Sequence, residues 1–248
     1  GGNSNIACCG KSVVVGGDLN HVTGAQSFVG GGKCNRTNGC SSTISGGYKN
    51  CVTTTGTGDA TTIGGGRNNC MEDVIYATIG GGYLNTMLGG LATSATIGGG
   101  QQNCNCANSS TISGGKCNLI SGSSAGAACS TVSGGYRNKN CGVNPKFGTI
   151  SGGTGNTQSG YMGTIGGGCG NTTAGACSTI GGGCGNTAEE KGTVVAGGKS
   201  NTASACYAAI GGGIANEALA CRSTIAGGSS NCITSGGLCS VIAGGTGG

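Results

Sequence analysis

The sequence predicts an all-β fold, a parallel β-solenoid (β-roll) of about 15 coils. The first observation is a motif, [Thr/Val]-[Ile/Val]-[Gly/Ser/Ala]-Gly-Gly-x-x-Asn, which recurs from Val14 to Ile242. The second is its period, because eight of the fourteen spacings are 15 residues and the others are longer by one to five. The third is composition: 61 Gly with one Pro and only 8% charged residues fit neither collagen nor a disordered chain. A fixed short period is typical of stacked coils that bury their apolar faces against one another.

Each coil is expected to contain a short strand at its Thr-Ile segment, because β-branched residues favour a half-buried pleated surface. Alternation along the strand then places the Ile or Val inside and the preceding residue, most often Thr, outside. The predicted core ladder consists of Val14, Val29, Ile44, Ile63, Ile79, Ile97, Ile112, Val132, Ile150, Ile165, Ile180, Val195, Ile210, Ile225 and Ile242.

The Gly-Gly pair that follows every anchor predicts a tight corner, which needs positive φ or an approach too close for a Cβ atom. We expect the Asn three positions after this pair to close the next corner, since Asn tolerates the left-handed conformation. Stacked Asn side chains are also expected to bond to one another. The predicted asparagine ladder consists of Asn20, Asn35, Asn50, Asn69, Asn85, Asn103, Asn118, Asn138, Asn156, Asn171, Asn186, Asn201, Asn216 and Asn231.

The predicted core is thin, because each coil reliably supplies one large apolar residue. Burying it stabilises the fold by about 2–3 kcal/mol, whereas ordering each backbone residue costs roughly 1–2 kcal/mol. Small cores of this kind need covalent staples or partners. We therefore expect a homotrimeric rod that also joins other copies end to end.

The 18 Cys residues predict disulfides and an oxidising compartment, hence an extracellular, cell-surface or virion-surface location. The absence of any C-x-x-C pair and the single His disfavour a metal site. Cysteines at one repeat position in stacked coils lie within disulfide range. The alternative is that small thiols fill coil corners. The candidate disulfides are Cys169–Cys184, Cys206–Cys221, Cys40–Cys51 and Cys221–Cys232, of which those that share Cys221 exclude each other.

Binding residues are expected at the two variable positions after Gly-Gly. Basic and aromatic side chains recur there and, when stacked, would form a stripe able to hold anionic glycans, although a solvated corner is the simpler interpretation. The candidate ligand stripe consists of Lys33, Tyr48, Lys49, Arg67, Tyr83, Lys116, Tyr136 and Arg137. One His and seven acidic residues without motif spacing predict no enzyme and no cofactor. We likewise expect no nucleic-acid partner and no membrane span.

Breaks in the period suggest a division of the chain. Residues 1–12 are expected to be a lead-in, 13–152 coils with insertion loops, and 153–248 regular stalk coils. The insertions fall at Cys51–Ala60, Thr86–Thr93, Leu119–Cys129 and Lys139–Phe147, and loops on one side of a solenoid often bind partners. Among three glycosylation sequons, Asn108 is the best candidate, because Asn35 and Asn171 belong to the ladder.

The units Ser178-Thr-Ile-Gly-Gly-Gly-Cys-Gly-Asn-Thr-Ala and Ser223-Thr-Ile-Ala-Gly-Gly-Ser-Ser-Asn resemble glycine-rich repeats of fibrous surface proteins. They are similar to the heads of trimeric autotransporter adhesins and to fibre proteins of phages and large DNA viruses. The resemblance covers Val13 to Gly248 and implies a parallel β-roll, three-fold assembly and a role as fibre or adhesin. The chain differs from the adhesin heads in its 15-residue period, its double Gly and its many Cys.

The function expected from these observations is a structural segment of an extracellular or virion-surface fibre, a rigid disulfide-stabilised rod. The first alternative is a receptor- or glycan-binding adhesin head that uses the stripe or the insertions. A second alternative is ice binding through the outward Thr row, which has one Thr per coil where such surfaces want two ranks. That row is also interrupted, for example at Phe28, Val194 and Ala209.

Overall fold

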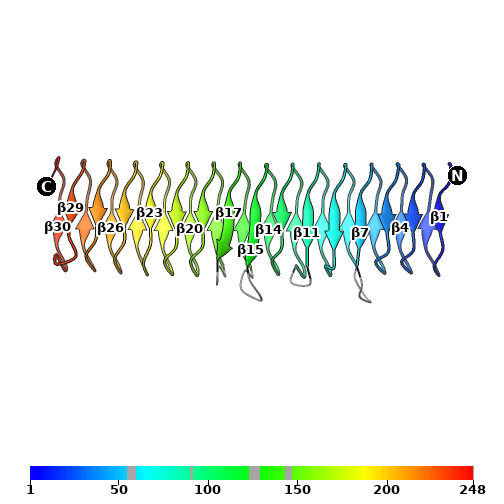
Figure 1. The fold of residues 1–248 in the computed structure, drawn as a ribbon, viewed down its shortest axis with the longest axis horizontal. Helices are drawn as coiled ribbons and strands as arrows, with labels where there is room; N and C mark the ends of the chain where they lie inside the picture. The colour runs from blue at the N-terminus through cyan, green and yellow to red at the C-terminus, as the bar shows by residue number, and fades with distance from the viewer. Residues whose placement is uncertain (55–59, 90–91, 123–128, 143–146, 248) are drawn as a thin grey trace. The chain divides into compact units, whose positions relative to one another are not determined.

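A computed structural model describes residues 1–54, 60–89, 92–122, 129–142 and 147–247. The chain forms two compact units, Gly1–Ile120 and Ser121–Gly248. Each unit is a parallel β-solenoid whose coils lie side by side (Figure 1), which confirms the predicted fold class and its count of about 15 coils. No helix occurs in the described ranges, and so none is long and apolar enough to cross a membrane.

The first unit contains two parallel sheets, one of odd-numbered strands (the first sheet) and one of even-numbered strands (the second sheet). In the first sheet the order is β1 (Ile6–Ala7), β3 (His21–Val22), β5 (Arg36–Thr37), β7 (Cys51–Thr53), β9 (Cys70–Glu72), β11 (Thr86–Leu88), β13 (Cys104–Asn105) and β15 (Leu119–Gly122). The second sheet runs β2 (Val13–Val14), β4 (Phe28–Val29), β6 (Thr43–Ile44), β8 (Thr62–Ile63), β10 (Thr78–Ile79), β12 (Thr96–Ile97) and β14 (Thr111–Ile112).

The second unit repeats this plan with the same two kinds of sheet. Its first sheet runs β17 (Lys139–Gly142), β19 (Thr157–Gln158), β21 (Thr172–Thr173), β23 (Thr187–Ala188), β25 (Thr202–Ala203), β27 (Glu217–Ala218) and β29 (Cys232–Ile233). Its second sheet runs β16 (Thr131–Val132), β18 (Thr149–Ile150), β20 (Thr164–Ile165), β22 (Thr179–Ile180), β24 (Val194–Val195), β26 (Ala209–Ile210), β28 (Thr224–Ile225) and β30 (Val241–Ile242). Within the expected lead-in, residues 1–12, Ile6 and Ala7 of β1 pair with His21 and Val22 of β3.

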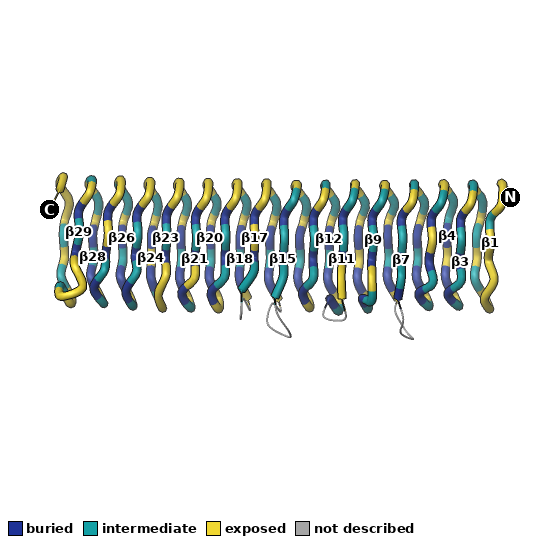
Figure 2. The backbone as a smooth tube through the Cα atoms, viewed as in Figure 1, coloured by how far each residue is buried: buried dark blue, intermediate teal, exposed yellow. Residues whose placement is uncertain are grey.

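The register follows the repeat, so that equal positions of neighbouring coils pair even where the spacing is not 15 residues. Thr78 pairs with Thr96 and Ile79 with Ile97 across a spacing of 18. The Thr residues therefore form the outward row of the second sheet, and the buried anchors form the inward row. Buried and more exposed positions alternate along the coils (Figure 2). Every anchor is buried except Val14 and Ile242, which are half-buried in the first and last coils of the chain.

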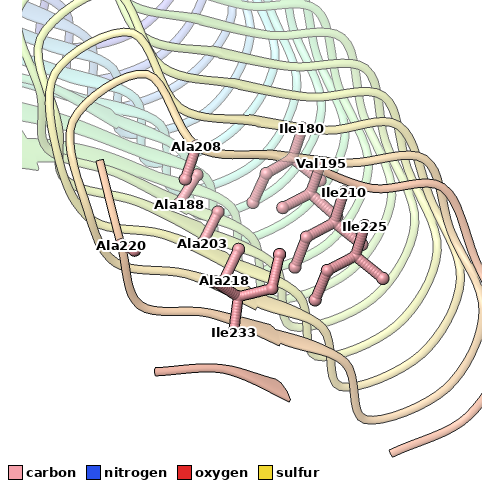
Figure 3. Close-up of a cluster of buried hydrophobic side chains, with 10 residues drawn as sticks. All are labelled: Ile180, Ala188, Val195, Ala203, Ala208, Ile210, Ala218, Ala220, Ile225 and Ile233. Carbon is pink, nitrogen blue, oxygen red and sulfur yellow. The ribbon is translucent and has the colours of Figure 1, made fainter. Parts of the chain in front are cut away.

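The interior contains a second row of side chains, from the first sheet, that the sequence analysis did not predict. This row lies eight residues after each anchor and faces the anchor row, as Ala188, Ala203 and Ala218 face Ile180, Val195 and Ile210 (Figure 3). In the first unit it is mostly apolar, with Val22, Val52, Met71, Met87 and Ile120 fully buried. The expectation of one large apolar residue per coil is therefore wrong for those coils.

The same interior row also holds polar residues, which explains why the sequence did not reveal it. Thr37, Asn140, Gln158 and Thr173 are all fully buried. Each leaves one side-chain oxygen without a hydrogen-bond partner among the described residues. Opposite Gln158 the chain has Gly148 and Gly163, where an added Cβ would meet the Gln158 amide. This row therefore accepts both polar and apolar side chains.

The corner after each anchor differs from the prediction in one respect. The residue in the left-handed conformation is the one before each ladder Asn, with φ of +56° at Leu19, +54° at Lys49 and +55° at Arg137. This conformation directs the backbone N–H of the left-handed residue toward the preceding coil. The Lys49 N–H donates back to Lys33 O, whereas the Tyr48 N–H donates forward to Gly66 O, each at 2.9 Å. Asn itself takes no positive φ in the ladder, because its role lies in the interior.

Each ladder Asn is fixed by hydrogen bonds that no other side chain reproduces. Nδ2 of Asn171 donates to Gly167 O at 2.9 Å and, in the next coil, to Gly183 O at 3.0 Å. Its Oδ1 accepts the backbone N–H of Asn186 at 2.9 Å. The pattern recurs along both units at the positions of the predicted ladder, and the structure adds Asn5. The amide is buried, and both its Nδ2 group and its Oδ1 atom have hydrogen-bond partners.

The second Gly of each pair is required by this network. Gly183 has φ of +89°, and a Cβ there would lie 2.1 Å from Gly198 O and 2.6 Å from Asn186 Nδ2. The closest atom belongs to the backbone, which cannot move aside as the end of a side chain could. The first Gly of the same pair, Gly182, has open space around an added Cβ and no positive φ. The two positions of one pair thus differ in what they tolerate.

We predict that Gly183→Ala lowers the free energy of unfolding by more than about 2 kcal/mol, since both the conformation and the contact exclude a Cβ. The matched variant Gly182→Ala should cost less than about 1 kcal/mol, because nothing contacts the added methyl group. Urea unfolding followed by circular dichroism measures both values. Equal costs at the two positions would contradict the assignment of Gly183 to the close approach.

Candidate functional site

A row of outward residues lies at the corner of each unit, four positions after each anchor. Successive members pair as isolated parallel bridges, which in the first unit join Asp18, Lys33, Tyr48, Arg67, Tyr83, Gln101 and Lys116. We call these seven residues the corner row. The structure thus brings five of the predicted stripe residues into one line. It adds Asp18 and Gln101, which share the repeat position of the others and were identifiable by that spacing.

The basic groups of the corner row contact their neighbours along it. Lys33 Nζ lies 3.0 Å from Asp18 Oδ2, and this hydrogen bond with its charge raises the pKa of Lys33. The Arg67 guanidinium lies 5.3 Å from the ring centre of Tyr48 and 5.8 Å from that of Tyr83. Lys49, one position later, contacts the Tyr48 ring at 5.2 Å. The row therefore places the Arg67 cation between two aromatic rings.

Two predicted stripe residues belong to the second unit. Tyr136 occupies the corner position there, and Arg137 lies over its ring at 4.9 Å. The row of the second unit continues with Thr154, Cys169, Cys184, Lys199 and Ile214. The basic and aromatic character is therefore concentrated in the first unit. Lys49 and Arg137 share the left-handed position before the ladder Asn.

The outward Thr residues form one row on each sheet of the second unit. On the second sheet Thr149, Thr164 and Thr179 are stacked before Val194 interrupts them. The first sheet carries a further row that the sequence analysis missed, Thr157, Thr172, Thr187 and Thr202. The two rows belong to different sheets. Neither sheet has the paired Thr ranks that we expect of an ice-binding surface.

None of the four candidate disulfides is formed in the structure. Cys169, Cys184, Cys206, Cys221 and Cys232 are free thiols, and Cys51 is also free, which leaves no Cys40–Cys51 bond. The register explains part of this result. Cys169 and Cys184 are in-register neighbours in the corner position, as predicted. In the first sheet, Cys51 instead has Arg36 and Cys70 as its neighbours. Cys232 has Glu217 as its neighbour.

The structure places Cys70 opposite Cys51, for which the sequence analysis had proposed Cys40 as the partner. They lie directly opposite each other in β7 and β9, although 19 residues separate them. A hydrogen bond from the Cys70 thiol lowers the pKa of Cys51 to about 6, against the effect of burial. Thr53 and Arg36 also lower this pKa, while Glu72 raises it. The pKa of the Cys70 thiol is raised by the same hydrogen bond and by burial.

A second close pair of thiols occurs within one short segment of the chain. Cys104 Sγ and Cys106 Sγ are 3.4 Å apart, with Cys104 in β13 and Cys106 just after it. The hydrogen bond from Cys104 lowers the pKa of Cys106 to about 7 and raises that of Cys104. The described residues contain no group of three His, Cys, Asp or Glu side chains arranged to hold a metal ion.

The remaining predicted site residues are placed as follows. Asn108 is exposed, and its Oδ1 accepts a hydrogen bond from Ser109 Oγ at 3.0 Å, whereas Asn35 and Asn171 are buried. The accessible sequon is thus the one predicted, and glycosylation there stays a prediction. Parts of all four insertions, residues 55–59, 90–91, 123–128 and 143–146, lie outside the described residues.

No protein-family model matches the chain, and a search of curated proteins gives no significant match. The class of protein that the structure defines is a β-solenoid repeat protein. The likeness to adhesin heads and viral fibres rests on the repeat motif alone.

We predict that alkylation of Cys51 by iodoacetamide follows a titration centred at about pH 6. The rate rises as pH increases through this value, because the thiolate is the reacting form, and it levels off above about pH 7.5. An unperturbed Cys, with a pKa of about 8.5, still gains rate between pH 7.5 and 9. Peptide mass spectrometry after timed labelling measures each site.

Cys70→Ala removes the hydrogen bond and should move the midpoint for Cys51 upward, whereas Thr86→Ala, the outward residue next to Cys70, should leave it in place. A midpoint near 8.5 in the unmodified chain would contradict the interpretation of this pair.

Proposed function

We propose that the chain is a rigid structural segment of an extracellular or virion-surface fibre. The observation that carries this proposal is the continuity of hydrogen bonds from coil to coil within each unit. Thr164 N–H donates to Ser178 O, and Thr179 N–H donates to Thr193 O, each at 2.9 Å. The Asn ladder adds a second, buried line of bonds in the same direction. A stack joined in this way resists both extension and bending.

Self-association as a homotrimer is part of this proposal. The interior of the second unit is thin, because Ala188, Ala203 and Ala218 are the side chains that face its anchors. An apolar ridge supports a contact between copies of the chain. Tyr161, Met162 and Tyr207 are 40–51% exposed at the corner that precedes the second sheet. Phe147, at the same corner, contacts the Tyr161 ring edge-on, with ring centres 6.1 Å apart.

We predict a particle with three times the chain mass of 23.2 kDa in light scattering at micromolar concentration. The double variant Met162→Ser with Tyr207→Ser should dissociate it, because the ridge loses two of its large exposed side chains. Val194→Thr, on the outward face of β24, is the control and should leave the mass unchanged. A monomer of 23.2 kDa for the unmodified chain would refute the trimer.

A second function, an adhesin that binds anionic glycans, is supported by the corner row of the first unit. There the Arg67 guanidinium lies between two tyrosine rings, and Lys116 follows three positions after Arg67 along the row. Sulfate or carboxylate groups of a polysaccharide bind basic side chains, while sugar rings stack on aromatic faces. This function is compatible with a role as fibre, because the row faces outward.

We predict that Arg67→Ala with Lys116→Ala weakens binding to immobilised heparin at least about threefold, with the largest effect at low salt. Lys191→Ala with Arg222→Ala removes the same number of charges from the second unit and serves as the control. Identical salt concentrations for elution of the two double variants would refute binding by the corner row.

A further inference from the structure

The register places Cys51 and Cys70 opposite each other in neighbouring coils. β7 and β9 are parallel, with Cys51 opposite Cys70, Val52 opposite Met71 and Thr53 opposite Glu72. Val52 and Met71 are fully buried, so alternation places both thiols on the outer side of the sheet. Neighbouring strands lie about 4.8 Å apart, which falls within the Cα separations of disulfides, about 4.4–6.8 Å. Both thiols are half-buried and thus reachable by a small reagent.

The surroundings give the two thiols different roles. Arg36 precedes Cys51 in the outward row, and Thr53 Oγ1 lies 3.1 Å from Cys51 Sγ. These groups and the hydrogen bond from Cys70 favour the thiolate of Cys51 at neutral pH, against the opposing charge of Glu72. Cys70 keeps its proton. A thiolate next to a protonated thiol is the arrangement of an attacking and a resolving cysteine.

We propose that Cys51 and Cys70 form a redox-active dithiol, which closes into a disulfide between coils by exchange with a small-molecule disulfide. The Cys51 thiolate attacks one sulfur of the reagent, forms a mixed disulfide and expels one thiolate. Cys70 then loses its proton and attacks the Cys51 sulfur, which expels the second reagent thiol. The protein gives up two electrons, and the reagent disulfide is reduced to two thiol groups.

This pair is favoured over the other close pair of thiols by its strand geometry. Cys104 and Cys106 are two residues apart along one chain segment, and two extended residues span about 6.6 Å, near the upper limit for a disulfide. Their ring would also enclose a single residue, Asn105, whose side chain is buried. Cys51 and Cys70 are instead brought together by the register, with no change in the backbone.

The bond would join the strands on either side of the 52–69 segment, which contains the first insertion of the repeat. Cross-linking a segment of this length restricts the unfolded chain and stabilises the folded one. The site therefore couples the redox state of the surroundings to the stability of the first unit. It is independent of the proposed role as a fibre, since it requires only β7 and β9.

The test is to equilibrate the intact chain with reduced and oxidised glutathione at several ratios, and then to block free thiols at low pH. Trypsin cuts after Lys49 and Arg67, so that Cys51 is the only cysteine in its peptide, and cleavage after Glu72 isolates Cys70 from Cys104. We expect the Cys51–Cys70 peptide pair to be the first disulfide to appear. Oxidation should raise Tm relative to the reduced chain.

Single variants test the two roles. In Cys70→Ser, Cys51 should accumulate as a mixed disulfide with glutathione, at least about tenfold faster than Cys70 does in Cys51→Ser. Cys117→Ser, a thiol of the same unit outside both pairs, is the control and should change neither rate. The mapping on the unmodified chain needs no variant to fold. Absence of the Cys51–Cys70 peptide pair at every ratio, or equal rates in the two variants, would overturn the proposal.

Discussion

The structure depends on one buried carboxamide per coil. Nδ2 of each ladder Asn joins the Gly carbonyl of its own corner to the Gly carbonyl of the next coil, and Oδ1 accepts the next ladder N–H. The Asn side chain is fully buried, and a buried polar group costs about 1–3 kcal/mol if it is left unpaired. Asp lacks the two donors, and Gln places its amide one methylene further away. The Asn is therefore fixed by hydrogen bonding.

Other features of the repeat follow from this bond. The second Gly has to lack a Cβ because the amide and the next corner occupy that space, as at Gly168 and Gly183. The residue before the Asn has to adopt positive φ to direct the amide inward, whatever its own side chain, as Leu19, Cys34 and Lys49 do. The spacing of six residues from anchor to Asn is therefore constant. Extra residues are tolerated elsewhere in the coil, which explains insertions without loss of register.

Periodicity was sufficient to predict the fold, the anchor row, the asparagine ladder and the outward corner row. It was insufficient where a buried position varies in both size and polarity, as for Met71, Thr37 and Gln158 in the second interior row. It also missed the left-handed residue, because that conformation is imposed by the buried Asn on whichever residue precedes it. Periodicity did not predict the pairing of Cys51 with Cys70, because an insertion lengthens their spacing to 19. Both nevertheless lie seven residues after an anchor.

The most direct test of the central role of the ladder is the free energy of unfolding of Asn201→Ala. This change leaves Gly197 O and the Asn216 N–H without the side-chain partners that Asn201 provides, and it removes one of the two donors to Gly213 O, which keeps the Lys199 N–H. We expect a loss of at least about 3 kcal/mol. Thr202→Ala, which alters the next, outward side chain of the same coil, should cost less than about 1 kcal/mol. Equal losses in the two variants would show that the buried amide is not what holds the coils together.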